Sequence, residues 1–78
     1  MLYYRWENAE KQRYYKIILS RDLFSDWIIT KVWGSLNNAS GRIIHFSCAS
    51  YAEAHAVIEK ISKTRRQRGY HLCEQAIQ

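Results

Sequence analysis

At 78 residues the chain has room for one domain with a modest hydrophobic core, and none for a separate catalytic lobe. Its 47% hydrophobic and 24% charged residues are typical of a folded domain, and its formal net charge of +5 favours an anionic partner such as nucleic acid. No apolar run approaches the ~18 residues that cross a bilayer, and the amino terminus lacks the pattern of a secretory signal. We therefore expect one cytoplasmic domain over residues 1–78 that does not associate with membranes.

Four segments have the composition or alternation of β-strands before any helical pattern begins. They span residues 2–7, 13–20, 27–33 and 42–48. The chain contains no proline, so its turns depend on glycine, asparagine, aspartate and serine. Because short connections favour antiparallel neighbours, we predict that these four strands form a meander.

One long helix follows the strands. Ser50 and Glu53 have the spacing of a capping box, and Gly69 is placed to end the helix after about 18 residues. Between them, apolar residues recur at helical spacing: Ala54, Val57, Ile58 and Ile61. Residues 70–73 are predicted to return as an edge strand and the last few residues to fray. The predicted fold class is α+β, an antiparallel sheet of four to five strands with one long helix packed on one face.

The third strand carries a row of large side chains on one face. Alternation places Trp27, Ile29, Lys31 and Trp33 together, and a single helix can cover only one face of the sheet. We expect the Trp33 ring and nearby cations to lie on the surface that the helix leaves uncovered. Trp33 can instead fill core volume at the end of the strand, as buried aromatic residues commonly do.

Several of these features occur in an order that resembles the WGR domain, a small module named for its Trp-Gly-Arg signature. The resemblance covers roughly residues 13–72, with boundaries soft by a few residues. It rests on the strand 14–19, the turn Asp22-Leu23-Phe24, the pair Trp33-Gly34, the strand after Gly41, the helix, and the segment 65–70. In this chain the third signature residue is Ser35 instead of arginine.

The resemblance implies a function. Modules of this family are often attached to poly-ADP-ribose polymerases, where they bind DNA ends and nicks, and bacteria also carry them as short stand-alone proteins. By that likeness Trp33 stacks on the nucleic acid, and Gly34, which tolerates unusual backbone angles, shapes the turn. A serine at position 35 cannot make the forked bonds of arginine to phosphate, so we take Lys31 and Arg42 as candidates for the missing charge.

A second basic group lies near the end of the predicted helix, with no acidic residue inside it. Its members are Lys60, Lys63, Arg65, Arg66 and Arg68, of which the last four are our candidates for contacts with a phosphate backbone. The alternative is that these cations complement the helix dipole and solvate the outer face of the helix.

Metal and catalytic chemistry find little support in the sequence. His45, Cys48, His71 and Cys73 are of metal-binding type but lack the paired spacing of zinc sites, so we expect free thiols, no metal and no cofactor. No carboxylate pair, nucleophile elbow or phosphate-binding glycine loop is present. We therefore predict a monomeric, non-enzymatic module that binds nucleic acid, DNA rather than RNA. The alternative is a protein-interaction adaptor with an exposed aromatic sheet face.

Overall fold

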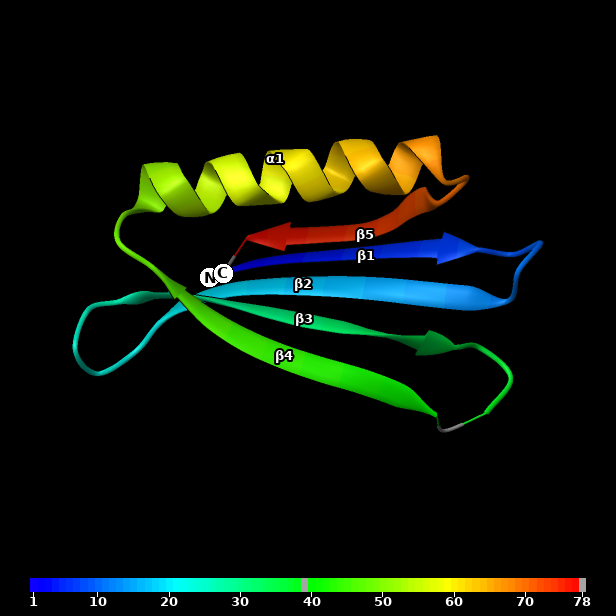
Figure 1. Cartoon of the computed structure of the whole chain (residues 1–78), viewed down its shortest axis with the longest axis horizontal. Coiled ribbons are helices and arrows are strands. Elements are labelled where there is room, and N and C mark those ends of the chain that lie inside the picture. Colours follow the sequence, from blue (N-terminus) through cyan, green and yellow to red (C-terminus); the bar gives the residue numbers. More distant parts are fainter. Residues whose placement is uncertain (39, 78) are drawn as a thin grey trace.

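The structure, a computed structural model, describes residues 1–38 and 40–77 and consists of one antiparallel sheet and one helix (Figure 1). The sheet has the strand order β4-β3-β2-β1-β5. Its strands are β1 (Leu2–Asn8), β2 (Arg13–Arg21), β3 (Trp27–Ser35), β4 (Gly41–Cys48) and β5 (His71–Ile77), and the helix is α1 (Tyr51–Gln67). The predicted α+β class is therefore confirmed.

The predicted meander is confirmed for β1 to β4, each of which pairs with the next strand. After the helix, β5 pairs antiparallel with the free side of β1, and the register shifts between Arg5 and Trp6. The predicted edge strand is thus present but longer than expected, because pairing with β1 continues to Ile77. The prediction that the last residues fray is wrong as far as Ile77, and Gln78 lies outside the described residues.

The ends of α1 follow the predicted signals. The Ser50 hydroxyl accepts a hydrogen bond from the Glu53 amide at 3.1 Å, and the Glu53 carboxylate accepts one from the Ala49 amide at 3.2 Å. At the other end Gly69 has a φ of 84°, a left-handed conformation that glycine adopts without a Cβ clash. The Tyr70 amide then donates to the Arg65 carbonyl at 2.9 Å, which closes the helix in a Schellman-like arrangement.

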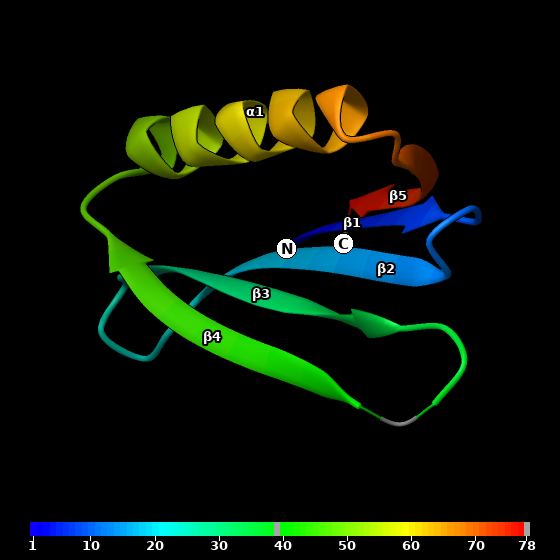
Figure 2. The ribbon, with the colours of Figure 1, turned by 45° about the vertical axis from the view of Figure 1, so that its right-hand side comes forward.

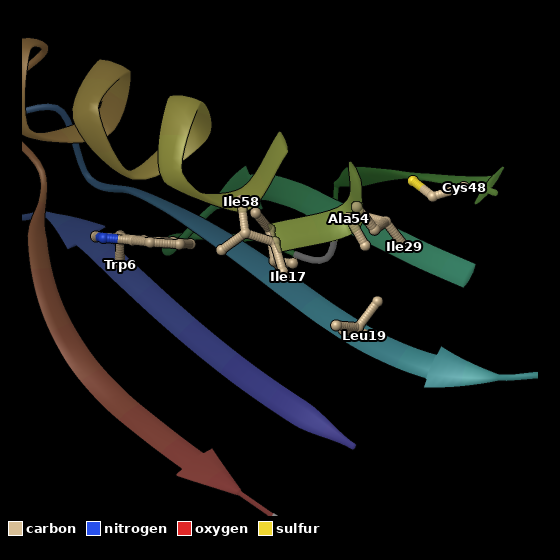
Figure 3. Packing of buried hydrophobic residues seen from close by; sticks show 7 residues of the cluster. All are labelled: Trp6, Ile17, Leu19, Ile29, Cys48, Ala54 and Ile58. Atoms are coloured by element: carbon tan, nitrogen blue, oxygen red, sulfur yellow. The ribbon is translucent and has the colours of Figure 1, made fainter. Parts of the chain in front are cut away.

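The core lies between α1 and one face of the sheet, which we call the helix-side face. Its fully buried members come from β1, β2, β3, β4 and the helix (Figure 3): Trp6, Ile17, Leu19, Ile29, Cys48, Ala54 and Ile58. The predicted apolar stripe is confirmed, since Ala54 and Ile58 are buried while Val57 and Ile61 pack against the cluster. Burial of this apolar area is the main source of stability in such a small domain.

The opposite, uncovered face of the sheet is only partly polar. It carries Tyr3, Ile18 and Val32, which are half-buried by their neighbours, and Ile43, which is 60% exposed. On the same face Thr30 and His45 share a hydrogen bond of 2.8 Å between Oγ1 and Nδ1. Figures 1 and 2 show that β4 approaches α1 at its end and diverges from it toward its start. The helix therefore leaves the beginning of β4 open on both faces.

The strand order separates the residues of metal-binding type. His45 and Cys48 lie on β4, whereas His71 and Cys73 lie on β5, at the other edge of the sheet. Both cysteines are free thiols, as the sequence predicts. Cys48 is buried, whereas Cys73 is exposed. Within the described residues, we find no helix with the length and hydropathy needed to span a bilayer.

Candidate nucleic-acid interface

Trp33 lies near the end of β3, on the helix-side face. It is an even number of residues from the buried Ile29, so alternation places both side chains on the same face. The prediction that Trp33 lies on the face of the sheet that the helix leaves uncovered is therefore wrong. Trp33 is nevertheless half-buried and not sealed in the core, because it lies at the end of the sheet where α1 also ends.

A row of aromatic rings connects Trp33 to the core. Its indole stacks on the Tyr15 ring at a centroid distance of 6.0 Å and an interplanar angle of 18°. Tyr15 in turn meets the buried Trp6 edge to face at 6.2 Å, and Trp6 stacks on Tyr4 at 5.7 Å. These contacts hold the indole in place on the side that faces Tyr15.

Gly34 has a different function from the one expected. Its φ is not in the left-handed region, where only Gly69 among the described glycines lies. Gly34 pairs with Gly41 of β4, and a Cβ on Gly34 would lie 2.4 Å from the Ser40 carbonyl oxygen and 2.9 Å from the Gly41 Cα. Glycine is therefore required here for the close approach of two backbones, which brings the loop after β3 next to Trp33.

Two adjoining hollows, each of about 450 Å³, flank Trp33. The loop hollow lies toward the β3–β4 connection and is lined by Lys11, Gln12, Arg13, Trp33, Gly34, Ser35, Asn38, Ser40, Gly41 and Arg42. The helix-end hollow lies toward the end of α1 and is lined by Lys11, Arg13, Tyr14, Tyr15, Trp33, Gly34, Arg65, Arg68 and Tyr70. Trp33, Gly34, Lys11 and Arg13 belong to both hollows, so Trp33 stands at the centre of one continuous site.

The charge of this site is positive throughout. The basic residues that line the two hollows are Lys11, Arg13, Arg42, Arg65 and Arg68, and no described Asp or Glu is among the lining residues. Such an arrangement can neutralise several phosphates while a flat ring contacts a base or sugar. It lacks the carboxylates, thiols and imidazoles of a metal centre, and the described part of the chain contains no group of three or more such residues.

The structure brings some of the predicted basic residues together and separates others. Arg42 pairs with Trp33 across β3 and β4, and Arg65 and Arg68 reach the same site from the end of the helix. Lys31, by contrast, lies over the Phe46 ring at 5.5 Å and lines neither hollow. Lys63 and Arg66 are exposed and also line neither hollow.

Arg65 is the most constrained cation of the site. Its guanidinium lies over the Tyr15 ring at 4.3 Å and over the Tyr70 ring at 4.8 Å. Its Nε is buried without a hydrogen-bond partner in the described structure. Burial raises the pKa of Tyr15, and this effect is larger than the opposing effect of the Arg65 charge. The phenol therefore stays neutral at physiological pH. Arg65 is thus a fixed positive charge that pairs with no carboxylate of residues 1–38 and 40–77.

Sequence reasoning missed Lys11 and Arg13. Arg13 pairs with Ser35 across β2 and β3, so its side chain starts directly beside the position where the family signature has arginine. The Ser35 hydroxyl accepts a hydrogen bond from the Asn37 amide at 3.1 Å and thereby shapes the loop instead of supplying charge. Only the strand register reveals this neighbour, since Arg13 and Ser35 are far apart in the sequence.

Asn8 positions two of the basic residues. Its side chain is buried, donates to the Arg68 carbonyl at 3.1 Å and accepts from the Lys11 amide at 3.0 Å. Asn8→Ala leaves both backbone groups without this partner, and we expect it to lower the free energy of unfolding by about 1–3 kcal/mol. Urea denaturation followed by circular dichroism measures this loss. Stability unchanged within about 0.5 kcal/mol would contradict the assigned contact.

Comparison with known proteins identifies a family. The WGR domain family matches residues 1–76, nearly the whole chain. No curated protein and no solved structure matches the chain. The matched region includes both hollows and all the residues that line them. The chain therefore belongs to the WGR domain family, whose modules are of a nucleic-acid-binding type.

Proposed function

We propose that this protein binds DNA that carries ends or nicks, as a cytoplasmic module without catalytic activity. The observation that carries the proposal is the placement of Trp33 between two hollows with five basic side chains and no described carboxylate. The family match supports nucleic acid as the class of ligand. The preference for ends and nicks comes from the family resemblance and from the position of the site at the end of the sheet.

In this proposal Trp33 supplies the stacking contact. Tyr15 occupies one side of the indole, so a base or sugar approaches the other side, next to Arg42. A stacked terminal nucleotide fits this geometry better than a nucleotide within a continuous duplex, whose base faces are already covered by neighbouring base pairs. Stacking of this kind contributes about 1–3 kcal/mol per base.

The basic side chains supply the contacts with phosphate. Arg13 and Arg42 are exposed guanidinium groups on the two sides of Trp33, and both belong to strands paired with β3. Guanidinium groups can form two hydrogen bonds to phosphate oxygens. Arg13 therefore makes the phosphate contact of the signature arginine, which this chain replaces by Ser35. Arg65 and Arg68 extend the positive surface to the helix end.

Salt dependence tests the proposal. Three to five phosphate contacts give a slope of log affinity against log salt of about −3 to −5, which corresponds to about 60- to 1,000-fold weaker binding between 50 and 200 mM salt. We expect this slope, with micromolar-class affinity, in anisotropy titrations of labelled nicked duplex. Blunt duplex and single-stranded oligonucleotides of the same length measure the preference. Absence of binding at 50 mM salt would overturn the proposed function.

A pair of charge variants sharpens this test. Arg42→Ala removes one cation from the loop hollow and is expected to reduce the magnitude of the salt slope by about 1. Lys63→Ala removes the same charge from an exposed position outside both hollows and is expected to leave the slope unchanged. Equal slopes for both variants would show that binding follows net charge and not this site.

The uncovered face of the sheet supports a second candidate function, an adaptor between proteins. Ile43 is 60% exposed there, beside Val32 on the neighbouring strand. An apolar interface on this face would bind its partner with a much shallower salt dependence than phosphate contacts. The salt titration therefore also separates the two functions.

A further inference from the structure

The turn between β2 and β3 carries the two most exposed large apolar side chains of the described structure. Leu23 is 98% exposed and Phe24 is 86% exposed, whereas the ring of Trp27, just beyond the turn, packs on Tyr51. We call the segment 22–26 the apolar turn. An adjacent leucine and phenylalanine held wholly in water, at the tip of a projecting turn, is a common feature of interaction sites.

The apolar turn is held in one conformation by its own hydrogen bonds. One Asp22 carboxylate oxygen accepts from the Phe24 and Asp26 amides, both at 2.9 Å. The Asp22 amide donates to the Asp26 carbonyl at 3.0 Å, and Ser25 takes a positive φ of 67°. The backbone that carries Leu23 and Phe24 is therefore preorganised, which lowers the conformational entropy lost on binding.

The chemistry of the apolar turn defines the surface that it fits. Carboxylates of Asp22 and Asp26 flank the apolar pair, and the Arg21 guanidinium donates to the Ser25 carbonyl at 3.2 Å. With one cation against two carboxylates, the turn has a net charge of −1 in a chain whose net charge is +5. A phenyl ring with adjacent carboxylates fits a pocket that combines aromatic walls with guanidinium groups. The helix-end hollow has this composition, and at about 450 Å³ it has room for a phenyl ring, while the adjoining loop hollow adds Arg42.

The two surfaces lie at opposite ends of the molecule. The apolar turn follows the end of β2, while the hollows lie at the end of β3 and α1, which run to the other side (Figure 1). The molecule extends 39 Å along its longest axis, so the turn cannot reach the hollows of its own chain. We propose that the apolar turn of one copy docks into the basic hollows beside Trp33 of a second copy.

The proposed contact is head to tail and joins two different surfaces. After one contact forms, one copy still has a free site and the other still has a free turn, so the association is open-ended and grows with protein concentration. A single turn in a single site buries less than the ~1,200 Å² of a standard interface. We therefore expect a dissociation constant on the order of 0.1–1 mM and a monomer in dilute solution.

Self-docking also gives the site a second ligand. The docked turn and nucleic acid both require Trp33 and the basic residues, so they exclude each other. This competition rests on the proposed function, whereas self-docking itself does not. Nucleic acid is expected to return the associated protein to single copies, and a concentrated protein is expected to bind nucleic acid less tightly per site.

Sedimentation equilibrium of the full chain tests self-docking. At low salt the weight-average mass should rise above the 9.3 kDa monomer as the concentration increases from about 20 µM to about 1 mM. Phe24→Ser and Asp26→Lys should each abolish this rise. Ile77→Ser, which removes a similarly exposed apolar side chain from β5, should leave it unchanged. A wild-type mass that stays at the monomer value at about 1 mM would overturn the proposal.

Mixing two variants identifies the two surfaces. Phe24→Ser keeps the hollows without a functional turn, and the double variant Arg13→Glu/Arg42→Glu keeps the turn without a functional site. Each variant alone should remain a monomer, and the equimolar mixture should form a heterodimer that does not grow further. Self-association of the Arg13→Glu/Arg42→Glu protein, or a monomeric mixture of two folded variants, would show that the turn does not dock beside Trp33.

Adding a short nicked duplex to the concentrated wild-type protein gives the final comparison. Loss of self-association at one duplex per protein supports competition for one site. Self-association that persists while the duplex is bound would place the two ligands on different surfaces and overturn the assigned docking site. If no duplex binds, the mixture of variants still decides on self-docking, so the two proposals fail independently.

Discussion

Trp6→Ala is expected to lower the free energy of unfolding by about 3–5 kcal/mol, because a large buried ring is lost and a cavity remains. Trp6 is only 1% exposed, lies on β1 between β2 and β5, and supports the rings of Tyr4 and Tyr15. Domains of this kind are stable by about 5–15 kcal/mol, so the loss takes a large share of the total. Guanidinium denaturation followed by far-ultraviolet circular dichroism measures it.

Trp6→Phe provides the matched variant. A phenyl ring retains part of the buried area and the edge contact with Tyr15, so the expected loss is clearly smaller than for alanine. The two variants should therefore rank in the order alanine, phenylalanine, wild type in denaturation midpoint. A loss below about 1 kcal/mol for Trp6→Ala would show that this ring is not central to the core.

The sequence predicts most of the fold because alternation and helix signals agree with the final structure. Strands β1 to β4 and the two ends of α1 are placed correctly within a few residues, and the stripe that contains Ala54 and Ile58 is the buried side of the helix. The extent of β5 is underestimated. Its segment contains the polar residues Glu74 and Gln75 and lacks the apolar pattern of a buried strand. It becomes a strand because it pairs with β1, and nearly all of its side chains are exposed.

The site is predicted less completely, because it depends on strand order and register. Trp33, Gly34 and Arg42 are close in sequence and in space, so local reasoning finds them. Arg65 and Arg68 become their neighbours only because α1 ends above the same end of the sheet. Arg13 enters through its pairing with Ser35, which no local pattern predicts. The face on which Trp33 lies is predictable from alternation, because Trp27 and the apolar Ile29 lie on the same face of the strand.

Gly34 is correctly predicted to need glycine, but the predicted reason, unusual backbone angles, is wrong. Unusual backbone angles are expected after a strand, yet Gly34 has ordinary ones. What requires glycine is the neighbouring strand, whose Gly41 Cα would lie 2.9 Å from a Cβ at position 34. Paired glycines on adjacent strands indicate close packing of backbones, and this pairing becomes visible only when the register is known.

Trp33→Ala is expected to weaken binding of nicked duplex by about 5- to 150-fold, the equivalent of 1–3 kcal/mol of lost stacking. The protein should remain folded, since Trp33 is half-buried and outside the fully buried core. All five cations of the site remain in this variant, so the salt slope should stay near the wild-type value while the affinity falls. Anisotropy titrations at two salt concentrations measure both quantities, at protein concentrations too low for self-docking.

Trp27→Ala is the matched control for that measurement. Trp27 lies on the same strand and face as Trp33 but at the other end, where it packs on Tyr51 at 5.1 Å and under Arg21 at 4.8 Å. Removing it deletes the same side chain and some stability, but nothing that lines the two hollows. The affinity of Trp27→Ala should equal that of the wild type. If both variants lose affinity alike, the effect of Trp33 comes from weakened folding; if a folded Trp33→Ala protein binds as the wild type does, the indole does not contact the nucleic acid.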